Sequence, residues 1–364
     1  MMRMRLASAR KLIVPLALLM GIHLAVLMAG FVAPYNPDMQ DRAAPNCPPT
    51  RVHWVSADGR LSWHPFIYGL SENVVTENGF AQPTKEAEPC TENPRTAYPI
   101  QFLRRGVPYT ILGVLTPDRH LLGVATPAHL HLMGTDNYGR DVFSRLLYGG
   151  QISLFAGLLA TALSLTMGVL LGTLAGFYGG WGDAVIMRGA ELFLALPWLY
   201  LLLALRAFLP LHTGPRQTFL LLIAVIGFLG WARPARLIRG VVLSAKERSH
   251  ILAARSFGAS DLHLLRVHLL PETRSVVLTQ AALLIPQYVL AEVTLSFLGL
   301  GLSEPVPSWG TMLATLQQYH VLVSDWWMFF PGVILVLVFL SYGGLSHALQ
   351  GARANAGAGW DAHR

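Results

Sequence analysis

The stretch Ala253-Ala254-Arg255-Ser256-Phe257-Gly258, followed further on by Leu270-Pro271, decides how the rest of this sequence is interpreted. It lies between two strongly hydrophobic segments and inside a cluster of arginines. Short basic loops between membrane spans face the cytoplasm by the positive-inside rule. The stretch therefore predicts a cytoplasmic loop on a membrane protein, with a small-residue surface on which a soluble partner could dock.

The composition predicts an integral membrane protein. Of the 364 residues, 53% are hydrophobic and 13% are charged, whereas a soluble domain carries about 25% charged residues. A net charge of +7 could indicate a nucleic-acid partner. The sequence argues against that, because the arginines sit mostly at the ends of apolar segments and the only lysines are Lys11, Lys85 and Lys246. This arrangement is typical of topology signals rather than of a phosphate-binding face.

The apolar segments predict an all-α fold with six transmembrane helices and both termini in the cytoplasm. A span needs roughly 20 apolar residues to cross the bilayer core. The basic residues before Leu12 and the length of the first apolar run favour a retained span over a cleaved signal peptide. We expect Pro197 to kink the third span. The expected spans are 12–33, 151–182, 189–205, 217–232, 275–302 and 326–347.

Four parts of the chain follow from these spans. Residues 1–33 are the cytoplasmic N-terminus and first span, and residues 34–147 are an extracytoplasmic insertion. Residues 148–350 are a five-helix core that carries the cytoplasmic loop 233–274, and 351–364 are a cytoplasmic tail. The insertion is too long for a simple loop, so we expect a small fold that contains some β structure.

Two features are expected inside the insertion. Apolar runs at 109–115 and 121–125 flank Pro117-Asp118-Arg119, a pattern typical of a β-hairpin. The two cysteines, Cys47 and Cys90, both fall in this block. An extracytoplasmic location favours a disulfide between them over two unpaired buried thiols.

A glycine ladder lies in the second expected span, at Gly168, Gly172 and Gly176. Small residues at this spacing share one helix face and let two membrane helices approach closely. The alternative is incidental glycine in a glycine-rich chain. In either case the ladder concerns packing rather than chemistry.

The cytoplasmic loop predicts two short helices joined by a glycine turn. Residues 245–257 favour a helix, and Gly258 fits the position after its end, where a positive φ costs glycine nothing. Ser260 can cap the next helix, and Asp261 complements its positive end. Pro271 is expected to end that second helix, because the residue before a proline avoids the helical region.

This loop resembles the cytoplasmic signature of the transmembrane subunits of ATP-binding cassette (ABC) importers. The signature is Glu-Ala-Ala, three residues, Gly, nine residues, Ile, one residue, Leu-Pro. Its matching positions here are Ala253, Ala254, Gly258, Leu270 and Pro271. The chain departs from the signature at two positions, where Leu252 replaces the glutamate and His268 replaces the isoleucine.

Other motifs are similar to one subfamily, the C-type permease of dipeptide, oligopeptide and nickel importers. The resemblance covers about residues 1–40 and 131–350 and leaves 41–130 outside it. The motifs are Ala33-Pro-Tyr-Asn-Pro37, Gly134-Thr-Asp-Asn-Tyr-Gly-Arg-Asp-Val-Phe-Ser-Arg145, Gly176-Phe-Tyr-Gly-Gly-Trp181, Leu290-Ala-Glu-Val-Thr-Leu-Ser-Phe-Leu-Gly-Leu-Gly301 and Pro307-Ser-Trp-Gly310.

The resemblance implies a type I ABC importer permease fold in a bacterial inner membrane. It implies that the loop docks onto two ATPase subunits, that a second permease pairs with the chain as a heterodimer, and that an extracytoplasmic binding protein delivers the substrate. Peptides are the implied substrates, ahead of nickel or another small solute.

The sequence contains no motif for covalent chemistry or for a cofactor. A phosphate-binding loop ends in Gly-Lys-Ser/Thr, but the lysines follow Arg10, Thr84 and Ala245. If ATP drives the protein, the ATPase is another polypeptide. No His-Glu-x-x-His or Gly-x-Ser-x-Gly motif occurs. We interpret His129 and His131, the closest histidine pair, as an exposed loop pair rather than a metal site.

Glu292 is the carboxylate expected deep in a span, where ionisable groups are functional candidates. It could line a translocation path near Gln287, or it could be a packing contact bonded to a neighbouring span. Glu191 follows Arg188 by three residues, which predicts a local ion pair.

Three other functions are weighed against the importer. An ion-driven secondary transporter would show more buried charge and related halves. A membrane-embedded enzyme would cluster catalytic residues at one membrane face. A membrane scaffold or sensor would use 34–147 as its receiver.

Overall fold

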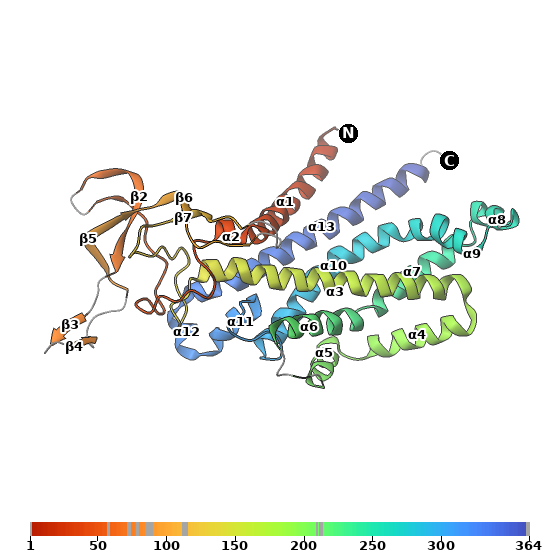
Figure 1. Cartoon of the computed structure of the whole chain (residues 1–364). Coiled ribbons are helices and arrows are strands. Elements are labelled where there is room, and N and C mark those ends of the chain that lie inside the picture. The colour runs from red at the N-terminus through yellow and green to blue at the C-terminus, as the bar shows by residue number, and fades with distance from the viewer. Residues whose placement is uncertain are drawn as a thin grey trace. The chain divides into compact units, whose positions relative to one another are not determined.

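The chain forms two compact units in a computed structural model that describes residues 2–56, 59–70, 74–77, 80–83, 90–110, 116–208, 210 and 214–361. The first unit comprises Met1–Gly21, Ser153–Ser303 and Leu335–Arg364, and the second comprises Ile22–Ile152 and Glu304–Ile334. The first unit is built from helices, and the second holds the described strands (Figure 1).

Three helical segments of the described chain are long and apolar enough to cross a membrane. They are α3 (Val142–Tyr178), the segment Asp261–Phe297 that contains α10 (Leu270–Phe297), and the segment Trp326–Ala348 that contains the start of α13 (Phe330–Asp361). These segments overlap the spans expected at 151–182, 275–302 and 326–347. The prediction of a helical membrane protein is confirmed.

The third expected span is not one continuous helix. Helix α4 (Gly180–Ala195) and helix α5 (Trp198–Ala207) meet at a bend of 95°. The residue before Pro197, Leu196, is extended with ψ 140, as the clash with a following proline ring favours. The proline therefore separates two helices, where the sequence predicted only a kink.

A second bent pair corresponds to the fourth expected span. Helix α6 (Pro215–Leu229) starts with a proline at its first turn, and α7 (Ala232–Ala245) continues it at 42°. If each bent pair is one span, the described residues contain up to five. The first expected span falls on α1 (Met2–Leu27) and α2 (Ala29–Val32), where the apolar helix Ile13–Leu27 is shorter. The count of six therefore stays a prediction.

The glycine ladder of α3 is a close-packing surface for α7. A Cβ atom built on Gly172 would lie 2.5 Å from the carbonyl oxygen of Ala235. One on Gly168 would lie 2.5 Å from Cβ of Pro234, and one on Gly176 2.9 Å from Cβ of Val242. No side chain fits at these distances, so the ladder interpretation is confirmed over incidental glycine.

The described residues of the second unit form three small antiparallel sheets. Strands β1 (His53–Val55), β2 (Leu61–Leu70) and β5 (Glu92–Pro99) form one in the order β1-β2-β5. The other two pair β3 (Val74–Glu77) with β4 (Phe80–Pro83) and β6 (Gln101–Arg105) with β7 (Arg119–Gly123). Ile67, Val124 and Leu130 form a buried core, and a disulfide joins Cys47 to Cys90.

The expected hairpin lies partly outside the described residues. The second expected run is present as β7, which pairs with β6, and residues 111–115 of the first run lie outside the described part, so the pairing of the two runs stays a prediction. The ladder continues past β6, where Gly106 donates to the carbonyl of Asp118 at 2.7 Å. Residues 101–105 lack an alternating apolar pattern, so no local pattern predicts strand β6.

The same unit includes the short helices α11 (Trp309–Ala314) and α12 (Tyr319–Ser324). Ser308 and Thr311 cap α11 reciprocally, each side chain bonding the other's backbone N–H. The indole N–H of Trp309 donates to the carbonyl of Leu146 at 3.0 Å. These contacts explain why Ser and Trp stand side by side in the motif at 307–310.

The interpretation of His129 and His131 as an exposed pair is wrong. His131 is 5% exposed. Its Nδ1 lies 3.1 Å from Asp141 Oδ1 and its Nε2 3.8 Å from Asp41 Oδ2, while His129 Nδ1 lies 3.0 Å from the same Asp41 oxygen. Burial opposes a charge on His131, but the two carboxylates outweigh it and raise the pKa of this histidine to about 9. The hydrogen bond from His129 holds the pKa of Asp41 below its usual range.

The first prediction tests the close packing of the α3 glycines against α7. Replacing Gly172 by Leu is expected to overpack the α3–α7 contact, which costs roughly 1–3 kcal/mol or more. The thermal unfolding midpoint in detergent should fall. Gly240 in α7 is the matched control, because a Cβ there meets nothing within 4 Å. Gly240→Leu should leave the midpoint unchanged or raise it; equal destabilisation by both variants would contradict the close-packing role.

The second prediction concerns pH. The folded pKa of His131 is about 9 against an ordinary value of 6.5, so its stabilisation is complete below about pH 6.5 and is lost as pH rises through about 9. The loss is on the order of 3 kcal/mol. Thermal unfolding of wild type and His131→Gln should differ strongly at pH 7 and converge by pH 10. A difference that does not change with pH would show that the histidine is not charged in the folded state.

Candidate functional site

Helix α8 (Ser249–Ser256) presents the two alanines of the signature. Ile251 is buried, Ala254 is half-buried and Ala253 is exposed. The expected helix at 245–257 is shorter than predicted, because α7 occupies Ala245 and the chain turns at 246–248. The alanines thus lie on a helix of two turns, with the outer face of Ala253 open to solvent.

Gly258 closes α8 in the conformation expected of it. Its φ is +83, and its N–H donates to the carbonyl of Arg255 at 3.0 Å. The N–H of Ala259 donates to the carbonyl of Ala254 at 3.1 Å. This pair of hydrogen bonds is the Schellman motif, in which the small apolar residue after the glycine packs on the last turn. Ala254 and Gly258 are therefore explained by the turn that they close.

The second helix begins as predicted at Ser260. The side chain of Ser260 accepts a hydrogen bond from the N–H of His263 at 3.4 Å, and Asp261 is in the first turn of α9 (Asp261–His263). Asp261 is exposed at this positive helix end, where a carboxylate is favourable.

The second helix does not end at Pro271. Helix α9 runs into a π-helical segment (Leu264–Leu269) and then directly into α10, so that Pro271 lies in the first turn of α10. The N–H of Leu270 bonds the carbonyl of Leu265, five residues back. This shift in the hydrogen-bond ladder comes just before the proline, which has no N–H to donate. The Leu270-Pro271 pair therefore continues a helix that the sequence predicted to stop.

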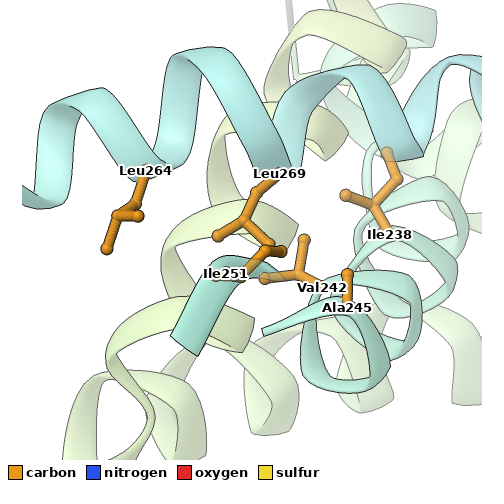
Figure 2. Packing of buried hydrophobic residues seen from close by; sticks show 6 residues of the cluster. All are labelled: Ile238, Val242, Ala245, Ile251, Leu264 and Leu269. Atoms are coloured by element: carbon orange, nitrogen blue, oxygen red, sulfur yellow. The ribbon is translucent and has the colours of Figure 1, made fainter. Parts of the chain in front are cut away.

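A buried apolar cluster holds the two signature helices against α7. Leu264 and Leu269 from the π segment and Ile251 from α8 meet residues of α7 (Figure 2). The α7 members are Ile238, Val242 and Ala245. An ion pair adds to this packing, with Arg248 Nη1 2.9 Å from Glu272 Oε1. No local pattern predicts this cluster, which forms the base of the turn, because its members are spread over more than thirty positions.

The outer surface of this turn is apolar and open. Phe257 is 92% exposed, and Leu252 and Leu262 are also exposed. Leu252 stands where the family signature has glutamate, so the departure from the signature adds an apolar side chain to this surface. Isolated exposed leucines need no explanation, but Phe257 together with Leu252 and Leu262 makes this turn a candidate contact surface.

The two residues expected on a translocation path face different directions. Glu292 is 0% exposed, and its Oε1 accepts a hydrogen bond from Ser296 at 2.8 Å. Gln287 is half-buried and lies five residues earlier, about 140° away around the helix. The hydrogen bond from Ser296 lies within α10 itself, so it does not reach a neighbouring span and both alternatives for Glu292 stay predictions. The expected pair of Arg188 and Glu191 is present, with Nη1 and Oε2 3.0 Å apart and both side chains exposed.

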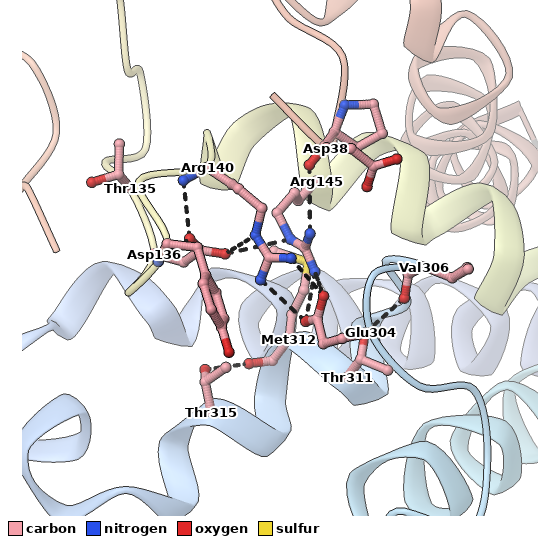
Figure 3. Close-up of polar contacts among 12 residues, drawn as sticks. Asp38, Thr135, Asp136, Arg140, Arg145, Glu304, Val306, Thr311, Met312 and Thr315 are labelled. Atoms are coloured by element: carbon pink, nitrogen blue, oxygen red, sulfur yellow. Dashed lines mark hydrogen bonds and ion pairs between the residues drawn. The ribbon is translucent and has the colours of Figure 1, made fainter. Parts of the chain in front are cut away.

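An ion network in the second unit, buried except at Glu304, was not predicted as a site. Arg140 Nε donates to Asp136 Oδ2 at 2.7 Å and Arg140 Nη1 to Glu304 Oε2 at 2.6 Å. Arg145 Nη2 donates to Glu304 Oε1 at 2.8 Å, so both guanidinium groups converge on one carboxylate (Figure 3). The signal available to sequence reasoning was the alternation of acids and arginines within Gly134–Arg145.

The glycines and Asp141 of this segment are explained by its backbone. Gly134 and Gly139 have φ of +74 and +73. A Cβ on Gly139 would overlap the carbonyl of Asp41. Asp141 Oδ2 accepts from the N–H of Ser144 at 2.7 Å and so caps the start of α3. The segment therefore supports α3 and the loops around it.

Comparison with known proteins gives a family and close relatives. The family described as "Binding-protein-dependent transport system inner membrane component" matches residues 168–354. The dipeptide transport system permease protein DppC of Bacillus subtilis (strain 168) is 37% identical over 227 residues, which cover 62% of this chain and 69% of that protein. The oligopeptide transport system permease protein OppC of the same strain is 35% identical over 248 residues, covering 67% and 76%.

A solved structure is also similar. A chain from the inward-facing MetNI methionine ABC transporter has 18% sequence identity and a TM-score of 0.41, with 57% of this chain and 95% of that chain covered. The family match spans α7, the signature turn, α10 and most of α13. The chain therefore belongs to the family of binding-protein-dependent transport system inner membrane components.

Proposed function

We propose that the chain is the transmembrane subunit of an ATP-driven ABC importer in a bacterial inner membrane and forms half of a translocation pathway for peptides. Its family supports transport, and the names of its dipeptide and oligopeptide permease relatives support peptides as the cargo. The proposal includes six spans with both termini in the cytoplasm. It also includes a heterodimer with a second permease, two ATPase subunits and an extracytoplasmic binding protein.

The observation that carries the proposal is the open apolar turn between α8 and α9. Phe257 projects into solvent from a turn whose glycine, serine cap and buried base fix its shape. A docking surface of this kind needs little ordering when a partner binds, which favours affinity. We assign it to an ATPase subunit, since the chain itself has no phosphate-binding loop.

The mechanism proposed is alternating access. ATP closes the two partner ATPases and displaces the docked turn, and the helices that pack on it carry the displacement into the membrane. The pathway opens outward and returns inward after hydrolysis. The chain contributes a mechanical joint and half of the pathway and performs no covalent step.

Affinity purification of the tagged chain in mild detergent tests the assembly. A second permease and ATPase subunits should co-purify, and Phe257→Asp should reduce ATPase recovery roughly tenfold, because a charge replaces a central apolar contact. Phe257→Leu, which keeps the apolar surface, should retain the ATPase. Recovery of the chain alone, still able to move solute in vesicles without ATP, would replace this proposal by the ion-driven transporter.

A second prediction tests the turn itself. Gly258→Val forces a β-branched residue into positive φ, at a cost of about 1–3 kcal/mol, and should abolish ATP-driven uptake or assembly. Gly258→Asn is the matched control, because asparagine tolerates this conformation. A Cβ on Gly258 meets nothing within 4 Å, so backbone strain is the intended difference between the two variants. Normal uptake with valine would refute this placement of the joint.

A further inference from the structure

Two cations, Arg239 in α7 and Lys246 directly after its end, hold the turn between α3 and α4. Nζ of Lys246 donates to the carbonyl of Gly176 at 3.0 Å, in the last turn of α3, where a cation is favourable. Arg239 binds both carboxylate oxygens of Asp183 through Nε and Nη2. Asp183 is in the first turn of α4. The two cations are seven residues apart, nearly two helical turns, and so point to one side of α7.

The pair of Arg239 and Asp183 differs in kind from the other contacts between α4 and α7. Further along, Ala190 and apolar neighbours on α4 pack against Trp231, Ala232 and Ala235. Apolar contacts are non-directional, so they favour burial without specifying one geometry between particular atoms. A bidentate guanidinium–carboxylate pair has fixed geometry. Both side chains are partly buried, with exposures of 32% for Arg239 and 16% for Asp183, and the pair is the contact between α4 and α7 with a defined geometry.

The same helix is the base of the docking turn. Ile238, immediately before Arg239, belongs to the buried cluster with Ile251 of α8 and Leu264 of the π segment. Val242 belongs to that cluster and also faces Gly176 of α3. A displacement of α8 therefore reaches α7 through apolar packing, and α7 is tied to α4 through an ion pair.

We propose that the Arg239–Asp183 pair transmits displacement of the docking turn from α7 to α4, which makes both residues positioning residues for transport. The inference rests on the proposed function, because it requires an ATPase to move α8. Without the pair, α7 would still pack on α3 and α4, but it would slide along α4 instead of moving it. ATP would then be hydrolysed with little transport.

The test uses the complete importer in proteoliposomes, with a mixture of labelled di- and tripeptides as the probe. Arg239→Lys keeps the charge and loses the bidentate geometry, and Asp183→Asn loses the charge. Each single variant should keep its ATPase rate within about twofold of the wild-type rate. The amount of peptide taken up per ATP hydrolysed should fall roughly tenfold, a factor within the usual range of coupling between sites. The double variant Asp183→Arg with Arg239→Asp should restore much of the ratio.

The result that overturns the inference is unchanged uptake per ATP in both single variants. If the single variants fail to assemble, the double variant decides. Recovery of assembly and of uptake per ATP supports transmission, whereas recovery of assembly alone shows a purely structural role. Wild-type complex that shows no ATP-dependent uptake would instead refute the proposed function, so the two failures are distinguishable.

A second readout does not depend on the substrate. Spin labels at Ser256→Cys in α8 and Tyr200→Cys in α5, both exposed positions, report the distance between the docking turn and the helix after α4. The described residues contain no free cysteine that would compete for label. ATP with vanadate should change the α8–α5 distance differently in wild type and in Arg239→Lys. Identical changes in both would contradict the inference.

Discussion

The close approach of α3 to α7 at three glycines is the constraint on which the loop-bearing end of the first unit depends. The backbone of Ala235 fills the space that a side chain on Gly172 would need. With α7 held there, Ile238, Val242 and Ala245 form a fixed base for α8 and the π segment. The rigid shape of the turn at Gly258 is therefore set by packing elsewhere as well as by its own hydrogen bonds.

The continuity of the chain from Asp261 to Phe297 changes how movement of that turn is carried. The sequence predicted a helix that stops at Pro271, which would have placed a flexible joint between the turn and the membrane. The structure has one helical segment of 37 residues instead. In the proposed importer, a displacement at Ser260 acts directly on α10, and it acts on α4 through α7. Movement of the turn therefore reaches the membrane helices by two routes, directly through α10 and through α7 to α4.

Sequence reasoning succeeded where the signal is local. A glycine at positive φ, a serine cap and a long apolar helix depend on residues within a few positions, so Gly258, Ser260 and α3 were predicted correctly. It failed where distant parts decide the outcome. Pro197 separates two helices while Pro271 lies inside one, and no local pattern distinguishes them. Likewise, Arg140 and Glu304 are 164 positions apart, and the partner of β7 is a strand without an apolar pattern.

The segment Gly134–Arg145 shows that similarity of a motif to a family does not by itself mark a contact with substrate. Its two arginines are balanced by Asp136 and Glu304, giving a network of two positive and two negative charges. Asp136, Arg140 and Arg145 are almost fully buried, and removing one of them would leave the buried charges unbalanced, where breaking a buried pair typically costs about 3–5 kcal/mol. That cost is sufficient to explain these residues through folding. The buried residues of the signature turn are likewise explained by their structural partners. The turn differs from Gly134–Arg145 in that Phe257 has its side chain in solvent. Contact with a partner is therefore sought at the exposed side chains of the turn, Phe257 first, and not at Ala254 and Gly258, which the turn itself explains.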